Sequence, residues 1–277
     1  MKGRVLIIAG SDSGGGAGIQ ADIKTITALG GFAMTALTAL TAQNTEGVHG
    51  VQEVPLDFIE QQIRVCLDDV GADVIKTGML HGAAVIERVV AVLDDYPDIP
   101  LVCDPVMRAK GGAVLLQDSA QAALKDVLLP RATLVTPNVP EAEALTGLTI
   151  VDAQTLAAAG RALSAHLNAS LNVPLNIQGA GWALMKGGHL PGEAMIDLLV
   201  SAQSCQPLVP GRRRSASRHT HGTGCTLAAA LAIGIAQGMD AFAAAQRAVR
   251  FVAGAMAQAP GYGTGHGPLN HAWQTHP

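Results

Sequence analysis

Short apolar runs alternate with longer stretches of helical periodicity along most of the sequence. The apolar runs, each followed closely by Gly, Asp, Asn or Lys, cover residues 5–9, 74–75, 101–103, 134–135 and 183–185. The helical patterns cover residues 57–70, 83–93, 119–128 and 155–167. Strands that alternate with helices predict parallel β-α-β units with right-handed crossovers. In such sheets ligands bind beyond the carboxyl ends of the strands, so we expect an active site along that edge.

The composition fits one large α/β domain. Of the 277 residues, 49% are hydrophobic and only 3% are aromatic, so the core must consist mainly of Ala, Val, Leu and Ile. Residues 226–258 predict two long helices with a break at 238–240, where Asp240 is a candidate cap. We place the domain at residues 1–260, followed by a loosely packed tail at 261–277 that is rich in Gly and His. His266, His271 and His276 lack the spacing of a metal site.

Charge and cysteine content exclude several classes of protein. A net charge of −4 offers no broad cationic surface for nucleic acid. The four cysteines are scattered without C-x-x-C pairing, which fits a reducing compartment. No apolar run reaches the length of a membrane span, and the first residues pass directly into a strand pattern. We expect a cytoplasmic protein with no membrane or nucleic-acid partner.

A glycine-rich loop at residues 10–18 follows the first predicted strand and precedes a helical pattern. A strand, a glycine loop and a helix in this order allow a ligand to approach the backbone closely. The loop lacks the Gly-Lys-Ser/Thr ending of a P-loop and does not fit G-x-G-x-x-G. We interpret it as a substrate-facing loop, with a flexible turn as the alternative.

A second glycine cluster, at residues 218–226, leads directly into an apolar helix. Glycines at a helix start leave backbone N–H groups free to bind phosphate oxygens. Cys225 falls in the first helical turn, where the helix dipole favours a thiolate that could act as a proton acceptor or a nucleophile. From spacing alone, a small buried cysteine is an equal alternative.

Several strings that occur in order along the chain carry a resemblance to a known family. They are AGSDSGGGAGIQAD (9–22), TALTAQNT (38–45), KTGML (76–80), DPVM (104–107), TPNVPEA (136–142), MKGGH (185–189) and THGTGC (220–225). Together they resemble the hydroxymethylpyrimidine/phosphomethylpyrimidine kinases of thiamine biosynthesis, which belong to the ribokinase superfamily. The likeness covers almost the whole chain up to the tail.

This resemblance implies a ribokinase-like three-layer αβα sandwich around a central, mostly parallel sheet. It also implies transfer of the γ-phosphoryl group of ATP, with Mg²⁺, to 4-amino-5-hydroxymethyl-2-methylpyrimidine, and then a second phosphorylation to the diphosphate. A homodimer is the implied assembly.

The resemblance further implies which residues form the site. The pyrimidine pocket would be lined by Gly10, Asp22, Gln43, Met79 and Val106, with Gln43 making paired hydrogen bonds to the ring. Asp104, Asn138 and Glu141 would place Mg²⁺, and Lys186, Thr220, Gly222 and Gly224 would bind the nucleotide. Catalysis would fall to Cys225 and Lys186 together with the backbone of Gly222, Thr223 and Gly224.

For three of these residues a purely structural role remains possible. Gln43 could cap a strand, Asn138 could cap a helix, and Lys186 could be a solvated lysine at a strand end. Two departures from the family pattern also stand out: position 219 is His where Asn is expected, and residues 168–181 match poorly.

Two other functions remain in view. A kinase of the same fold acting on pyridoxine, pyridoxal or pyridoxamine is the first, since its substrate also bears a hydroxymethyl group on an aromatic ring. Gln43 and Cys225 favour the pyrimidine kinases, because typical ribokinase members carry Asp at the position of Cys225. A catalytically silent vitamin-binding sensor is the second, and retention of the phosphate-handling residues argues against it.

Overall fold

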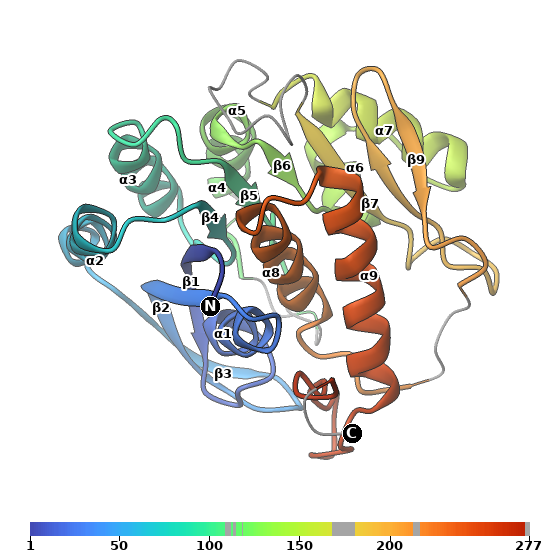
Figure 1. Cartoon of the computed structure of the whole chain (residues 1–277), viewed down its shortest axis with the longest axis horizontal. Helices are drawn as coiled ribbons and strands as arrows, with labels where there is room; N and C mark the ends of the chain where they lie inside the picture. The colour runs from blue at the N-terminus through green and yellow to red at the C-terminus, as the bar shows by residue number, and fades with distance from the viewer. Residues whose placement is uncertain (109–111, 113–114, 118, 168–180, 213–216, 275–277) are drawn as a thin grey trace.

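A computed structural model describes residues 1–108, 112, 115–117, 119–167, 181–212 and 217–274. Within these residues a nine-stranded sheet with the order β3-β2-β1-β4-β5-β6-β7-β8-β9 forms the middle layer (Figure 1). Strands β2, β1, β4, β5, β6 and β7 pair in parallel, whereas β3, β8 and β9 pair antiparallel at the two edges. The mostly parallel sheet predicted from the alternating pattern is confirmed.

The five apolar runs of the sequence coincide with β1, β4, β5, β6 and β7, whereas β2, β3, β8 and β9 are not among those runs. Their bounds are β1 Arg4–Asp12, β2 Phe32–Gln43, β3 Val48–Glu53, β4 Val74–Thr77, β5 Leu101–Cys103, β6 Leu134–Val135, β7 Trp182–Lys186, β8 Asp197–Val200 and β9 Cys205–Leu208. The core strands read as unbroken apolar runs because helices cover both faces of the sheet. On β1, for example, Leu6 and Ile8 pack on one side while Val5 and Ile7 pack on the other.

Two helical layers enclose the sheet. One contains α2 Leu56–Asp69, α3 Ala83–Leu93, α4 Ala120–Ala123, the π-helical turn η1 Leu124–Leu128, α5 Leu129–Arg131, α6 Val139–Thr146 and α7 Ala153–Ser164. The other contains α1 Gly18–Ala28, α8 Thr223–Ala236 and α9 Ala241–Ala257, with α8 and α9 side by side (Figure 1). The break predicted before α9 is present, and the Asp240 side chain accepts a hydrogen bond from the N–H of Ala243.

The described part of the C-terminal segment, residues 261–274, packs against the rest of the chain. His271 is buried with its Nε2 2.9 Å from Oγ1 of Thr226 on α8, and the Trp273 ring lies 6.2 Å from that of Phe251 on α9. Pro268 forms a β-bridge with His221. The loose packing expected from the Gly and His content is therefore wrong for these residues, because the Trp273 ring and the His271 imidazole find partners on α9 and α8. His276 lies outside the described residues.

Among the helices described, none combines the length and apolar character needed to cross a membrane.

Candidate active site

A cavity of about 840 Å³ opens where β1, β4, β5, β6 and β7 end. It lies at the carboxyl edge of the parallel strands, as the alternating pattern predicts. Every residue that the sequence singled out for the site lines this cavity except Asp22: Gly10, Gln43, Met79, Val106, Asp104, Asn138, Glu141, Lys186, Thr220, Gly222, Thr223, Gly224 and Cys225.

Asp12, which sequence reasoning did not single out, shapes the glycine loop. Its carboxylate accepts hydrogen bonds from the N–H groups of Gly14, Gly16 and Ala17 at 2.8, 3.0 and 2.8 Å. Burial alone would raise the pKa of Asp12, but the bonds from His221 and from these N–H groups lower it overall. A carboxylate at the last position of β1 therefore holds the loop in one conformation, so the flexible-turn alternative does not apply.

His221 lies between the glycine loop and Gln43. Its Nε2 donates to Oδ2 of Asp12 at 2.9 Å, since a carboxylate can only accept, and the amide nitrogen of Gln43 lies 3.3 Å from the same atom. The Gln43 amide oxygen accepts from Thr41 Oγ1 at 3.2 Å. Because Nε2 of His221 gives its hydrogen to Asp12, it cannot also accept from the amide nitrogen of Gln43, so the bond from Thr41 is the one that orients the amide. The side chain of Gln43 borders the cavity and does not cap β2.

The glycine loop and the start of α8 touch directly. Gly222, the N-cap of α8, has φ +80°, and a Cβ there would lie 1.8 Å from the carbonyl oxygen of Gly16. Only glycine satisfies both constraints. The α8 N-terminus borders the cavity, and the first N–H groups of a helix have no acceptor within it, so the binding of phosphate there stays a prediction.

Lys186 lies at the end of β7 between two acids. Its Nζ is 3.3 Å from Oδ1 of Asp104 and 3.9 Å from Oε2 of Glu141. Burial lowers the pKa of Lys186, but these two carboxylates outweigh that effect and raise it overall, so the ammonium group is retained. A Cβ on Gly224 would lie 3.6 Å from both Lys186 Nζ and Asp104 Oδ2. The cation therefore lies beside the α8 N-terminus and is not a solvated strand-end lysine.

Asn138 and Glu141 form a capping box at the start of α6. Oδ1 of Asn138 accepts from the N–H of Glu141 at 2.9 Å, and Oε2 of Glu141 accepts from the N–H of Asn138 at 2.8 Å. The helix-cap role that the sequence left open for Asn138 is thus present. Burial raises the pKa of Glu141 to about 7, although Lys186 acts in the opposite direction. The box fixes both side chains at the cavity wall.

The donor atoms at this wall fit a sparsely ligated Mg²⁺ ion. Oδ2 of Asp104 is buried without a hydrogen-bond partner among the described residues, while Oδ1 accepts from Thr136 Oγ1 at 3.0 Å. In the described part of the chain no group of three or more His, Cys, Asp or Glu side chains could hold a metal. Mg²⁺ keeps several waters and needs only one or two carboxylates, so Asp104 and Glu141 are suitable ligands.

Asp22 does not line the cavity, which corrects its predicted place in the pyrimidine pocket. It is fully buried on α1, and its Oδ2 lies 2.8 Å from Nζ of Lys76 on β4. Lys76 is the member of this pair that borders the cavity. A lysine directly after the apolar run 74–75, inside the KTGML string, was the signal that sequence reasoning overlooked.

The structure also corrects the expected thiolate at Cys225. The residue occupies the first turn of α8 as predicted, but burial raises the pKa of its thiol to about 12. The ammonium of Lys76 and the N–H of Gly18, which donates to the sulfur, lower this pKa only in part, and Asp22 and Asp104 raise it. Desolvation outweighs the helix dipole here, so the resting group is a thiol.

The other end of the cavity is apolar. Met79, Ala39 and Leu115 form a small buried cluster with Val106 packed against it. A Cβ on Gly10 would lie 3.0 Å from Sδ of Met79, so the methionine packs closely against the bare backbone of Gly10 and a larger residue there would push it into the cavity. Shape and dispersion dominate at this end.

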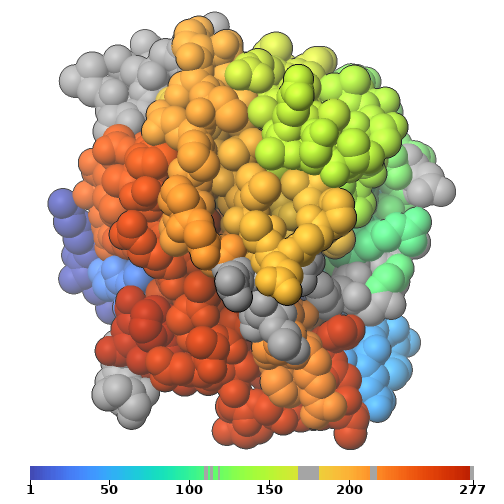
Figure 2. Space-filling view, turned by 90° about the vertical axis from the view of Figure 1, so that its right-hand side faces the viewer, coloured from blue at the N-terminus to red at the C-terminus, as the bar shows by residue number. Residues whose placement is uncertain are grey.

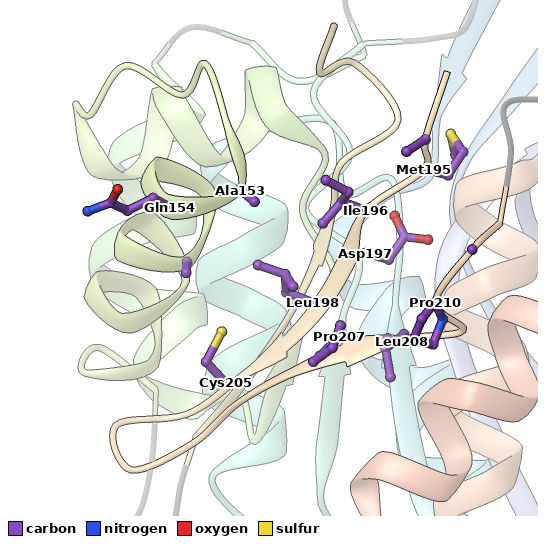
Figure 3. Close-up of a pocket in the computed structure, with 13 residues that line it drawn as sticks. Ala153, Gln154, Met195, Ile196, Asp197, Leu198, Cys205, Pro207, Leu208 and Pro210 are labelled. Carbon is purple, nitrogen blue, oxygen red and sulfur yellow. The ribbon is translucent and has the colours of Figure 1, made fainter. Parts of the chain in front are cut away.

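A second, smaller hollow of about 520 Å³ lies between α7 and the β8–β9 hairpin. Figure 2 shows the face that carries α7, the hairpin and the C-terminal residues. In Figure 3 Leu198 points toward α7, whereas Asp197 points to the opposite side of the hairpin. Asp197 forms an ion pair with Arg212, and both border the larger cavity. The ring of His219, at the departure from the family pattern, packs against Gly267.

Comparison with known proteins matches residues 12–270 to the family model described as phosphomethylpyrimidine kinase. The chain is 45% identical to a Bacillus subtilis hydroxymethylpyrimidine/phosphomethylpyrimidine kinase, over 97% of this chain and 94% of the relative. It is 46% identical to the Geobacter sulfurreducens thiamine biosynthesis bifunctional protein ThiED, covering 98% of this chain but 52% of that longer protein.

Among solved structures, the Staphylococcus aureus pyridoxal kinase in complex with AMP-PCP superposes with a TM-score of 0.86 at 32% identity. That match covers 100% of this chain and 96% of the kinase. The fold is ribokinase-like, and the chain is a phosphotransferase that belongs to the phosphomethylpyrimidine kinase family.

Proposed function

We propose that this protein uses ATP to phosphorylate 4-amino-5-hydroxymethyl-2-methylpyrimidine to its monophosphate and then to its diphosphate, in thiamine biosynthesis. One observation carries the proposal: a single cavity holds a cation and a helix N-terminus at one end and an apolar wall with an oriented amide at the other. Phosphoryl transfer to a flat, polar-edged ring needs both ends.

At the phosphate end, Lys186 and the N–H groups of Gly222 to Cys225 hold the transferring group. Negative charge spreads over the phosphoryl oxygens in the transition state, and fixed donors and a cation stabilise it without rearrangement. Thr220 lies on the same wall and binds the nucleotide phosphates. Because Lys186 is held by Asp104 and Glu141 before ligand binds, its position needs no adjustment during the reaction.

Asp104 and Glu141 would hold Mg²⁺, with Asn138 fixing the Glu141 carboxylate from the capping box. When bound, the ion supplies positive charge to the phosphate oxygens of the nucleotide. The unpartnered Oδ2 of Asp104 supports this assignment.

At the ring end, Gln43 donates and accepts hydrogen bonds along one edge of the pyrimidine, and Met79, Val106 and the bare backbone of Gly10 contact its faces. Cys225 accepts the proton of the hydroxymethyl group as its oxygen attacks the γ-phosphorus. Because the resting group is a thiol, it must first lose its own proton to solvent, and the thiolate that forms is a strong proton acceptor because its pKa is high.

We also propose that residues 1–260 form the catalytic domain and residues 261–277 an appended segment, and that the protein is a cytoplasmic homodimer. The β2–β3 extension supports the dimer, because β3 is an exposed edge strand and Leu40 and Val51 are 46% and 41% exposed there. Light scattering of the purified protein measures the oligomeric state directly.

Parallel assays of ADP formation test the function. They compare hydroxymethylpyrimidine, its monophosphate and pyridoxal as phosphate acceptors. Turnover of both pyrimidines well above that of pyridoxal supports the proposal, and the reverse preference would favour a pyridoxal kinase, the activity named for the S. aureus structure. No ADP release with any acceptor, while ligands still bind, would indicate a silent sensor.

The same assay with a Cys225 variant tests the proposed base. We expect Cys225→Ala to lower kcat by about 10²–10⁴-fold and to leave the residual activity of the anion-binding surface. Near-normal kcat with both pyrimidine substrates would remove Cys225 from the proton-acceptor role.

A further inference from the structure

Residues 263–268 of the C-terminal segment, called the C-terminal strap below, lie against the turn between β2 and β3. The N–H of His266 donates to the carbonyl oxygen of Thr45 at 2.8 Å, and the N–H of Gly265 donates to Thr45 Oγ1 at 3.3 Å. The hydroxyl of Thr264 donates to Oε1 of Glu46 at 2.8 Å. These hydrogen bonds join the end of the chain to residues that follow Gln43 closely in the sequence.

The C-terminal strap lies so close to this turn that no side chain fits between them. A Cβ on Gly265 would lie 2.1 Å from the carbonyl oxygen of Thr45, and a Cβ on Gly263 would lie 2.3 Å from its Oγ1. Both distances are far shorter than van der Waals contact, so an added methyl group would push the turn away. Gly265 does not have a positive φ, so at this position the contact alone excludes a side chain.

The other end of the C-terminal strap contacts the loop before α8. The N–H of His221 donates to the carbonyl oxygen of Gly267 at 3.2 Å, and Pro268 forms a β-bridge with His221. The glycine loop meets both residues, because a Cβ on Gly16 would lie 2.5 Å from Cδ2 of His221 and 3.2 Å from Cβ of Pro268. The strap therefore connects the β2–β3 turn to two segments that border the cavity.

Gln43 needs this support because it is the last residue of β2. The chain continues through residues 44–47 into β3, an exposed strand at the edge of the described sheet, and a two-stranded hairpin is only marginally stable by itself. The register also shifts between Ala42 and Gln43, so strand pairing does not fix the backbone there. The N–H of Gln43 donates to Ser13 Oγ at 2.8 Å, and that hydroxyl donates to its carbonyl oxygen at 2.9 Å. The glycine loop thus holds Gln43 on one side, and the strap holds the turn on the other.

We propose that Thr264, Gly265 and His266 of the C-terminal strap are positioning residues for the ring end of the cavity. They hold the turn at 44–47 against the body of the protein and so set the place of Gln43 relative to the glycine loop. The inference rests on the proposed role of Gln43 in binding the ring of the phosphate acceptor. Loosening the strap should therefore weaken acceptor binding, while phosphate transfer at the Lys186 end continues.

Gly265→Ala tests the proposal, with Gly47→Ala as the matched control. Both variants add one methyl group at this turn, but a Cβ on Gly47 would meet no atom within 4 Å and its φ is not positive. We expect Gly265→Ala to raise acceptor KM about 10-fold and to leave kcat and ATP KM within about 3-fold of the wild type. Gly47→Ala should match the wild type in all three.

Hydrogen exchange gives a readout that does not depend on turnover. Amides of residues 44–53 should exchange about 10-fold faster in Gly265→Ala than in the wild type without ligands, while α8 and α9 keep their rates. A strap that only stabilised the fold would instead speed exchange in α8 and α9 as well and lower kcat. An unchanged acceptor KM, or exchange that accelerates evenly along the chain, would overturn the proposal.

The test is separable from the identity of the acceptor. KM is measured with whichever of hydroxymethylpyrimidine and pyridoxal the wild type turns over faster, and the Kd from calorimetry replaces KM if neither is turned over. A preference for pyridoxal would contradict the proposed function, and the effect of Gly265→Ala on pyridoxal KM would still decide the role of the strap.

A second variant serves if Gly265→Ala fails to fold. Thr264→Val removes the hydrogen bond to Glu46 and keeps the shape of the side chain, so acceptor KM should rise about 3-fold with kcat unchanged. Thr264→Ser keeps the hydroxyl and should match the wild type. Equal acceptor KM in these two variants would count against the strap as a positioning element.

Discussion

At one end of the active-site cavity Lys186 is fixed between Asp104 and Glu141, whereas at the other end Met79, Val106 and Gly10 form an apolar wall with Gln43 at its edge. The first end consists of one cation and two acids that hold one another in place before any ligand binds. The second end consists of an apolar surface and the amide of Gln43. Fixed charges stabilise the transition state, whereas a complementary shape strengthens substrate binding. Substitutions at the Lys186 end should therefore lower kcat, and substitutions at the Gln43 end should raise KM for the pyrimidine.

The largest effect is expected at Lys186. Lys186→Met removes the cation beside the α8 N-terminus and leaves Asp104 and Glu141 facing the phosphates unneutralised, so kcat should fall about 10³-fold. KM for the pyrimidine should change little. Steady-state kinetics with saturating ATP measures both, and Lys125→Met, on the outer helical layer, is the matched control. A loss expressed only in pyrimidine KM would contradict the division between the two ends.

Gln43→Ala tests the ring end. The variant leaves polar atoms of the pyrimidine edge unpaired, which costs about 1–3 kcal/mol, so pyrimidine KM should rise about 10-fold or more. ATP affinity should not change, because Gln43 lies on β2, away from Lys186. Gln203→Ala, in the exposed β8–β9 turn, controls for a general effect of losing an amide. Equal losses for both substrates would indicate misfolding through the His221 contact.

Glu141→Gln tests metal binding without disturbing the start of α6. The amide oxygen of Gln can still accept from the N–H of Asn138, so the capping box of α6 is retained while the charge is lost. We expect the Mg²⁺ concentration for half-maximal rate to rise about 3-fold or more, with pyrimidine binding unchanged in the absence of ATP. An unchanged Mg²⁺ titration would exclude Glu141 from the metal site.

The smallest effect on catalysis is expected at His271, which contacts Thr226 on α8; its predicted effect is on the free energy of unfolding. Burial lowers its pKa from 6.5 to about 4, with a smaller contribution from Lys24. The unfolded chain therefore binds the proton first, and the stability that the neutral ring contributes is present above pH 6.5 and lost as the pH falls toward 4.

Urea unfolding at pH 8 and pH 5 measures this contribution. From the shift, His271 should account for a loss of roughly 2 kcal/mol between these two pH values, and His271→Gln should abolish that part. His166→Gln, an exposed histidine at the end of α7, should lose as much as the wild type. Identical pH dependence of the His271 variant and the wild type would show that the segment does not stabilise α8.

The fold was predictable from the sequence because its signals are local. The buried core strands are mostly short apolar runs, and Asp240 precedes α9 by the spacing of an N-cap. The glycine loop and the α8 start were predictable for the same reason, since φ and close backbone contact require glycine at fixed positions. For Asn138, composition alone could not decide between a cap and a ligand; the structure has the cap, and a role toward the metal stays a prediction.

The rest depended on contacts between distant segments. Lys76 and Asp22 belong to different elements, and nothing in either local pattern reveals that they meet in the interior. Asp12 and His221 are joined in the same way across most of the chain. The protonation of Cys225 follows from desolvation, which depends on how the whole molecule closes over the thiol and so could not be inferred from its place in a helical turn.

The contact between Gly222 and Gly16 has a consequence for biosynthesis of the protein itself. One wall of the site is made early in translation and the other late, and each lacks its counterpart until α8 has left the ribosome. A partly synthesised chain can form β1 and its glycine loop but has no surface for the phosphates. ATP turnover by nascent chains should therefore be absent until the last third of the protein has emerged.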